Sequence, residues 1–210
     1  MDNIEKLSRM FSEFPGIGTR QAKRFVYFLM TKNPEFLADM TSLISNLKNE
    51  IKSCGNCSRF FQKNYLNSPL CEICGDKNRD KTKLMLVSRD IDLETVEKSG
   101  SYNGMYFVLG GSIPILDKNP ENQIRLKKLL SYLDEKVKNG DTANKLKEII
   151  LGLNANPTGE HTAEFLKNAL SEFSAKYGVK ISILGRGLST GTELEYSDAD
   201  TIKNALKNRA

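Results

Sequence analysis

All four cysteines of the chain lie between residues 54 and 74 and form two Cys-x-x-Cys pairs. Cys54-Gly-Asn-Cys57 is followed by a loop of thirteen residues and then by Cys71-Glu-Ile-Cys74. Each pair can place two thiolates on a tight knuckle, and the loop lets the two knuckles meet around one ion. Four thiolates at this spacing predict a structural, tetrahedral site for one Zn²⁺ per chain, because zinc takes thiolate readily and needs no open coordination position.

Two disulfides, or one redox-active Cys-x-x-Cys pair, are the alternatives for these cysteines. Disulfides need an oxidising compartment, and the start of the sequence, MDNIEKLSRM, carries acids where a signal peptide would have a basic and then an apolar stretch. A redox pair would leave the second Cys-x-x-Cys without a role. We therefore favour zinc, expect a cytoplasmic location, and expect the site to fix a helical N-terminal part against a longer α/β part.

Positive charge is concentrated in the N-terminal part of the chain. The net charge is +5; residues 1–83 hold 14 Lys and Arg against nine Asp and Glu, whereas residues 84–210 hold 17 of each. The composition, 39% hydrophobic and 27% charged, is that of an ordinary globular protein, and no apolar run approaches a membrane span. We therefore expect no membrane partner, and a polyanion such as DNA should meet the N-terminal part.

The motif Phe-Pro-Gly-Ile-Gly-Thr at residues 14–19 separates two stretches with helical periodicity, 2–12 and 20–30. Its two glycines give a turn without side chains, so that backbone N–H groups can approach a phosphate, and the next helix presents the positive end of its dipole. This pattern is typical of a helix-hairpin-helix, although an ordinary turn with a solvated basic face is the alternative. The predicted DNA-binding residues are Gly16, Gly18, Arg20, Lys23 and Arg24.

Two further features of the N-terminal part have more than one interpretation. A third helix is expected over residues 34–51, and its broad apolar stripe can pack on the first two helices or serve in part as a contact with a second copy of the chain. The loop between the cysteine pairs contains Phe60, Phe61 and Tyr65. These rings can cover the metal site, which we favour, or stack on bases.

From residue 84 onward, short apolar runs alternate with helical patterns. The expected strands are Leu84–Val87, Met105–Leu109, Glu148–Leu153 and Val179–Leu184, and the expected helices cover residues 90–98, 121–138, 160–176 and 198–209. This alternation predicts an α/β fold with a parallel sheet and right-handed crossovers. Ligands of such sheets bind beyond the carboxyl ends of the strands.

Several motifs in order resemble the RecR family of bacterial recombination mediators over essentially the whole chain. They are FPGIGTRQAKR, CGNC…CEICGDKNRD, SYNGMYFVLGGSIPILD, NPTGEHTA and RGLSTGTELEYSDADTIKNALKNR. The resemblance implies a helix-hairpin-helix domain (1–53), a four-cysteine zinc finger (54–75), a Toprim domain (80–178) and a last strand with a C-terminal segment (179–210). It also implies a non-enzymatic clamp, a dimer or a tetrameric ring, that binds single- and double-stranded DNA with little sequence preference and works with RecO and RecF to load RecA onto single-stranded gaps.

The chain departs from the family at positions that bear on catalysis. Ser88 stands where Toprim proteins have a glutamate, and the Thr158-Gly159-Glu160 segment is shortened relative to the family. The alternative function is a metal-dependent nuclease or primase, which needs clustered carboxylates. The strand ends offer Asp90, Asp92, Asp117 and Glu160, but not at the family's acidic positions. We therefore expect no catalytic residue. A sequence-reading regulator is disfavoured, because no helix after the cysteines offers several side chains to base edges.

Overall fold

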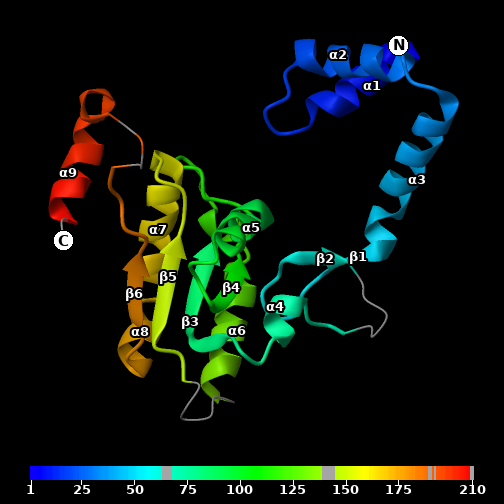
Figure 1. Ribbon diagram of the computed structural model, residues 1–210. Helices are drawn as coiled ribbons and strands as arrows, with labels where there is room; N and C mark the ends of the chain where they lie inside the picture. Colours follow the sequence, from blue (N-terminus) through cyan, green and yellow to red (C-terminus); the bar gives the residue numbers. More distant parts are fainter. Residues whose placement is uncertain (63–67, 139–144, 189–190, 192, 209–210) are drawn as a thin grey trace. The chain divides into compact units, whose positions relative to one another are not determined.

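The chain folds into two compact units, residues 1–52 and residues 53–210. The computed structural model (Figure 1) describes residues 1–62, 68–138, 145–188, 191 and 193–208. The cysteine-rich residues belong to the second unit, together with the α/β part.

The first unit contains three helices at the predicted places. They are α1 (Asn3–Ser12), α2 (Thr19–Met30) and α3 (Pro34–Glu50). The side chain of Asp2 accepts a hydrogen bond from the N–H of Glu5 and so caps α1, and Asn33 caps α3 in the same way. The core between α1 and α2 is small: Phe11 and Phe25 meet edge to face, with 5.9 Å between their ring centroids. The expected helices of this unit are confirmed.

The second unit is built on a parallel sheet of four strands, as predicted. The strands are β3 (Asp80–Val87), β4 (Gly104–Val108), β5 (Glu148–Gly152) and β6 (Lys180–Ile183), in the order β4-β3-β5-β6. The helices of this unit are α5 (Asp90–Ser99), α6 (Leu126–Lys138), α7 (Pro157–Ala169), α8 (Ser171–Tyr177) and α9 (Ala199–Lys207), with short 3-10 turns at 120–122 and 194–196. The register aligns Leu84 of β3 with Met105 of β4 and Ile149 of β5.

The two faces of the sheet bury two different sets of residues. Side chains alternate along each strand, so Leu84 and Leu86 of β3 face one cluster and Met85 and Val87 face the other. The first cluster includes residues of α6 and α7. The second includes Leu93 of α5 together with Cys54, Cys57 and Cys71. The cysteine-rich segment therefore forms part of the layer that covers one face of the sheet.

Three short elements surround the cysteines and were not expected. They are β1 (Ile51–Ser53), β2 (Phe60–Gln62) and α4 (Glu72–Gly75). β1 and β2 pair with each other as a separate two-stranded sheet around the first cysteine pair. Each of these elements is only one turn or three residues long, so it leaves no periodic signal in the sequence.

Two of the expected helices begin or break at different places. The helix expected over 121–138 begins at Leu126, because the N–H of Arg125 donates to the carbonyl of Leu109 at 2.8 Å and holds the preceding residues in a loop. The helix expected over 160–176 is two helices that meet at the fully buried Leu170. The last helix, α9, ends at Lys207; residues 209–210 lie outside the described range.

None of the helices that the structure describes is both long and apolar enough to be a membrane span.

Candidate metal centre and nucleic-acid interface

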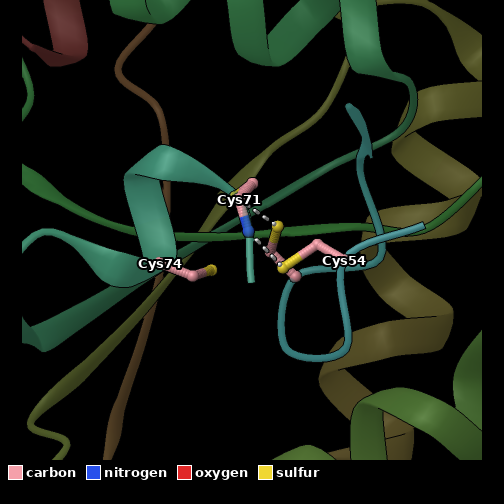
Figure 2. Close-up of side chains that lie close together, drawn as sticks. Cys54, Cys71 and Cys74 are labelled. Carbon is pink, nitrogen blue, oxygen red and sulfur yellow. Dashed lines mark hydrogen bonds between the residues drawn. The ribbon is translucent and has the colours of Figure 1, made fainter. Parts of the chain in front are cut away.

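The four cysteine sulfurs converge on one point. They come from the loop between β1 and β2 (Cys54 and Cys57) and from the start and body of α4 (Cys71 and Cys74), and all four lie within 4.8 Å of one another. Figure 2 shows the side chains of Cys54, Cys71 and Cys74 directed toward a common centre. The sulfurs of Cys57 and Cys71 are 3.6 Å apart. Four thiolates around one ion at about 2.3 Å would be about 3.8 Å apart, so the donor set fits a tetrahedral metal ion.

Backbone hydrogen bonds form the two knuckles that carry these sulfurs. The N–H of Ser58 donates to the carbonyl of Cys54 at 3.0 Å, and the N–H of Gly75 donates to the carbonyl of Cys71 at 2.9 Å. A further bond runs from the N–H of Cys71 to the sulfur of Cys54 at 3.4 Å and links the two knuckles. N–H donors of this kind favour the thiolate form and orient it. The residues between the pairs at 63–67, including Tyr65, lie outside the described range.

The four thiols cannot all ionise without a cation. Hydrogen bonds from the neighbouring thiols lower the pKa of Cys54, and the bond from Cys57 has the largest effect. The hydrogen bond between Cys74 and Cys54 instead raises the pKa of Cys74. Although its hydrogen bond with Cys54 opposes ionisation, those with Cys57 and Cys74 lower the pKa of Cys71 to about 7, and a hydrogen bond with Cys54 raises the pKa of Cys57. Ionisation of two thiols is therefore favoured and ionisation of the other two is opposed. A divalent cation removes this opposition, which is why such clusters bind metal with release of protons.

Arg59 gives partial charge compensation at the edge of the cluster. Its guanidinium donates to the carboxylate of Glu72 at 2.9 Å, and its side chain is largely buried. Although burial opposes the charge, Glu72 and then the thiol groups of Cys71 and Cys57 raise the pKa of Arg59. This permanent cation suits a four-thiolate metal centre, whose net charge is negative.

The knuckles are attached to the sheet as well as to each other. The N–H of Val108, in the edge strand β4, donates to the carbonyl of Cys57 at 2.8 Å. Arg125 donates from one guanidinium nitrogen to the carbonyls of Ser58 and Val108, at 2.7 and 3.1 Å. The cysteine module thus covers the edge of β4 and occupies backbone groups that would otherwise be exposed.

The carboxyl ends of the strands hold hydroxyl groups where a Toprim catalytic site would hold an acid. Ser88, directly after β3, is 1% exposed, and its hydroxyl accepts a hydrogen bond from the hydroxyl of Ser112 at 3.1 Å. The buried hydroxyl of Thr162 in α7 accepts a bond from the N–H of Ile113 at 2.9 Å. These bonds tie the loop after β4 to β3 and α7 without any ionised group.

Each acid that the sequence places at the strand ends accepts a hydrogen bond or forms an ion pair within the chain. Asp90 accepts a hydrogen bond from the N–H of Phe60 at 2.7 Å, and Asp92 accepts one from the N–H of Arg89 at 2.9 Å. Glu160 pairs with Arg186.

Asp117, the fourth acid, accepts hydrogen bonds from the backbone N–H of Asn119 and the side-chain amide of Gln123. Within the part of the chain that the structure describes, the four cysteines are the only cluster of three or more potential metal ligands. The acids therefore do not converge there on a magnesium site.

The predicted nucleic-acid residues lie at the start of α2. Gly16 has the left-handed φ of +79° that the turn requires, and Gly18 is the N-cap of α2. No side chain caps this helix, and no acid lies in its first turn, so its first N–H groups and its positive dipole end are available to an anion. Arg20 and Lys23 are exposed and line one groove, whereas Arg24 is exposed outside it and donates to Gln21 at 3.3 Å.

Arg9 of α1 was missed by the sequence analysis. It lines the same groove as Arg20 and Lys23, in a space of about 480 Å³ that is also lined by Glu5, Ser12 and Thr19. Since α1 and α2 run side by side, Arg9 and Arg20 come together although eleven residues apart. The signal that could have found it is the position of Arg9 near the C-terminal end of an amphipathic helix that faces the hairpin turn.

Comparison with known proteins gives matches along the whole chain. Residues 82–185 match the model of the Toprim domain, and residues 187–210 match a model described as RecR, C-terminal. Proteins named Recombination protein RecR are similar throughout: that of Lactobacillus acidophilus is 32% identical over 98% of this chain and 96% of its own length. Those of Chloroherpeton thalassium and Legionella pneumophila are each 33% identical, over 99% and 100% of this chain and 96% and 97% of their own.

The chain belongs to the RecR family.

Membership confirms the resemblance that the motifs indicated and the α/β fold with its Toprim sheet. It assigns the chain to a family of recombination proteins. Membership does not require the acids at the described strand ends to converge, because different sites can be built on one fold.

We expect the purified protein to carry about one tightly bound metal ion per chain, and zinc is the ion that four thiolates favour. Cys57→Ser should release the metal and lower the free energy of unfolding by about 4 kcal/mol or more, because Cys57 is both a ligand and part of the core on the sheet. Metal analysis and denaturant unfolding measure the two effects. Asn56→Ala, inside the same knuckle, is the control. A chain that keeps its stability after complete removal of metal would contradict a structural role.

Proposed function

We propose that this chain is a non-enzymatic DNA-binding protein of recombinational repair, which acts as an oligomeric clamp and helps RecO and RecF to load RecA onto single-stranded gaps. The observation that carries the proposal is the uncapped, cationic start of α2 in a chain whose full length matches recombination proteins. Arg20, Lys23 and Arg24 supply charge to phosphates, and the backbone of Gly16 and Gly18 supplies close approach.

The metal in this proposal is a structural zinc ion. The donor set of Cys54, Cys57, Cys71 and Cys74 leaves no position for a substrate or a water molecule, and three of the four residues are buried. The zinc would hold the loop between β1 and β2 against α4 and keep both on the face of the sheet. It supplies no chemistry to a reaction.

RecO and RecF are included in this proposal only because the chain belongs to the RecR family. We assign their binding to the α/β unit, because its surface has no excess of either charge over residues 84–210 and so is not committed to a polyanion. The unit carries exposed apolar side chains beyond the strand ends, Ile115 and Leu116, which suit contact with a protein.

The alternative function, a Toprim nuclease or primase, requires two metal ions held by carboxylates. We expect no cleavage or synthesis with Mg²⁺ or Mn²⁺, because Ser88 supplies no charge and Asp90 and Glu160 are already paired. Labelled single- and double-stranded DNA should remain intact on denaturing gels. Cleavage that disappears in Asp90→Asn or Glu160→Gln would support the enzyme instead.

DNA binding should be insensitive to sequence and strongly dependent on salt. Each phosphate contact that is lost lowers the slope of log affinity against log salt concentration by about one. The double variant Arg20→Ala, Arg24→Ala should therefore bind more weakly and lose about two units of slope, measured by fluorescence anisotropy at several salt concentrations. Lys176→Ala, Lys180→Ala removes the same charge from the other unit and is the matched control. If the Arg20, Arg24 variant binds like the parent at every salt concentration, the hairpin is not the DNA site.

Few phosphate contacts per chain argue for several copies acting together. One hairpin offers about three or four such contacts, which salt at physiological concentration weakens strongly. Copies held in one assembly make the later contacts intramolecular, which raises apparent affinity about a hundredfold or more. The helix α3 supports such an assembly: it has no buried residue in the single chain, and Leu43 is 70% exposed.

A dimer or a tetrameric ring should therefore use the apolar stripe of α3. Leu43→Glu, Leu47→Glu should shift the protein toward smaller species and weaken its binding to DNA about tenfold or more, because avidity is lost while the hairpin residues are unchanged. Light scattering over a concentration series and anisotropy measure the two effects. Ser45→Glu, on the opposite side of the same helix, is the control. A parent protein that is monomeric at all concentrations and still binds DNA tightly would contradict the clamp.

A further inference from the structure

Phe60 and Phe61 are neighbours on β2 with opposite environments. Phe61 is 6% exposed and packs in the cluster that contains the cysteines, whereas Phe60 is 53% exposed. The alternation of side chains along a strand explains the difference. The sequence left two uses open for these rings, and the structure separates them: Phe61 covers the metal centre and Phe60 does not.

The exposed ring of Phe60 is held in place from two sides. Its backbone N–H donates to the carboxylate of Asp90 at 2.7 Å, and the guanidinium carbon of Arg125 lies 5.5 Å from its ring centroid. Asp90 begins α5 directly after β3, and Arg125 precedes α6. Figure 1 shows β2 and its neighbour α4 beside the part of the sheet that contains β3 and β4. Phe60 is thus anchored at the carboxyl ends of these strands, where parallel sheets bind ligands.

Arg125 is itself fixed and has no acidic partner within the described chain. One guanidinium nitrogen donates to the carbonyls of Ser58 and Val108, and no described carboxylate forms an ion pair with it. Gly110 makes room for this side chain, since a Cβ there would lie 3.0 Å from its Nε. Backbone carbonyls, rather than an ion pair, therefore fix the position of this guanidinium.

The backbone has an unusual conformation two residues before Phe60, where the first cysteine knuckle ends. Ser58 has a φ of +60°, and it is the one residue other than glycine with a left-handed backbone in the described parts of the chain. In this conformation its carbonyl meets Arg125 at 2.7 Å and the hydroxyl of Ser53 at 3.2 Å. Strain of this kind persists where the surrounding structure enforces it, and it is concentrated at functional sites.

We propose that Phe60, backed by Arg125, is a stacking platform for an unpaired base of single-stranded DNA. A rigid, exposed aromatic ring next to a guanidinium is the element by which proteins hold unpaired bases without reading their sequence. No other aromatic ring of the described residues stacks on Phe60. The contact is separate from the hairpin at α2, because it lies in the other unit and uses the face of a base rather than a phosphate.

The charges around Phe60 favour a base over the other partners considered. Arg89 and Arg125 are balanced by Asp90 and Asp92, so the site has no net charge with which to attract a phosphate backbone strongly. The guanidinium of Arg125 lies over the ring, and a cation of this kind also favours the face of an aromatic base. Stacking on Phe60 should therefore contribute affinity that does not change with salt.

A single tryptophan makes this contact directly observable. The chain contains no Trp, so Phe60→Trp gives one fluorescent reporter at the site. Addition of oligo(dT) should quench its emission in a saturable way, at the concentrations at which anisotropy of labelled oligo(dT) reports binding. Tyr196→Trp places the same reporter at another exposed position, 77% exposed in the parent, and should show little quenching.

Loss of the ring should weaken binding without changing its salt dependence. Phe60→Ala should lower the affinity for oligo(dT) about fivefold or more, leave the salt slope unchanged, and have little effect on duplex DNA, whose bases are already stacked. Phe60→Tyr should retain the parental affinity. Unchanged metal content and unfolding in Phe60→Ala would establish that the fold is intact.

Two results would overturn the proposal while leaving the function of the hairpin in place. One is unchanged emission from the Phe60→Trp variant while anisotropy reports that it has bound oligo(dT). The other is equal quenching in the Phe60→Trp and Tyr196→Trp variants, which would indicate contact without a site. Failure of the parent protein to bind any DNA would instead remove the function proposed for α2.

Discussion

The convergence of four cysteine sulfurs holds together the layer that covers one face of the sheet. The segment that carries them is too short to form a hydrophobic core of its own, and its elements are single turns or three-residue strands. Held together at the sulfurs, these elements become one layer over the sheet, with Cys57 packed among Met85, Val87 and Tyr106. The hydrogen bond from Val108 to the carbonyl of Cys57 then extends the same layer over the edge of β4. A metal ion bound by these four sulfurs would therefore also stabilise the packing of this face.

The carboxyl ends of the same strands keep the geometry of the shared fold with a serine, Ser88, in place of an acid. Parallel strands bring Ser88, Ser112 and the acids after β3 to one edge, as in any sheet of this kind. The hydroxyl pair and the bond from Phe60 to Asp90 use these groups to join loops instead of leaving carboxylates free to hold metal ions. The edge therefore positions the cysteine module, and through it the ring of Phe60.

Net charge differs between residues 1–83 and residues 84–210. The excess of positive charge lies in residues 1–83, and the start of α2 combines cations with unpartnered backbone donors. Residues 84–210 carry no net charge, which would allow copies of this part of the chain to come close without repulsion. In the proposed function, phosphate contacts at α2, the ring of Phe60 and the exposed apolar helix α3 would each contribute modestly, and binding of DNA would be the sum of these contributions.

Local signals in the sequence were enough for the metal site, the three N-terminal helices and the four parallel strands. Cys-x-x-Cys spacing determines knuckle geometry within four residues, and apolar runs such as that before Val87 report burial directly. Only the tertiary structure determined the hydrogen-bond partner of Asp90, which is the backbone N–H of Phe60, 30 residues away. Only the tertiary structure also placed Arg9 beside Arg20. It also decided which ring, Phe60 or Phe61, covers the metal. The reason is physical: these outcomes depend on contacts between distant segments, and such contacts have no period or spacing in the sequence.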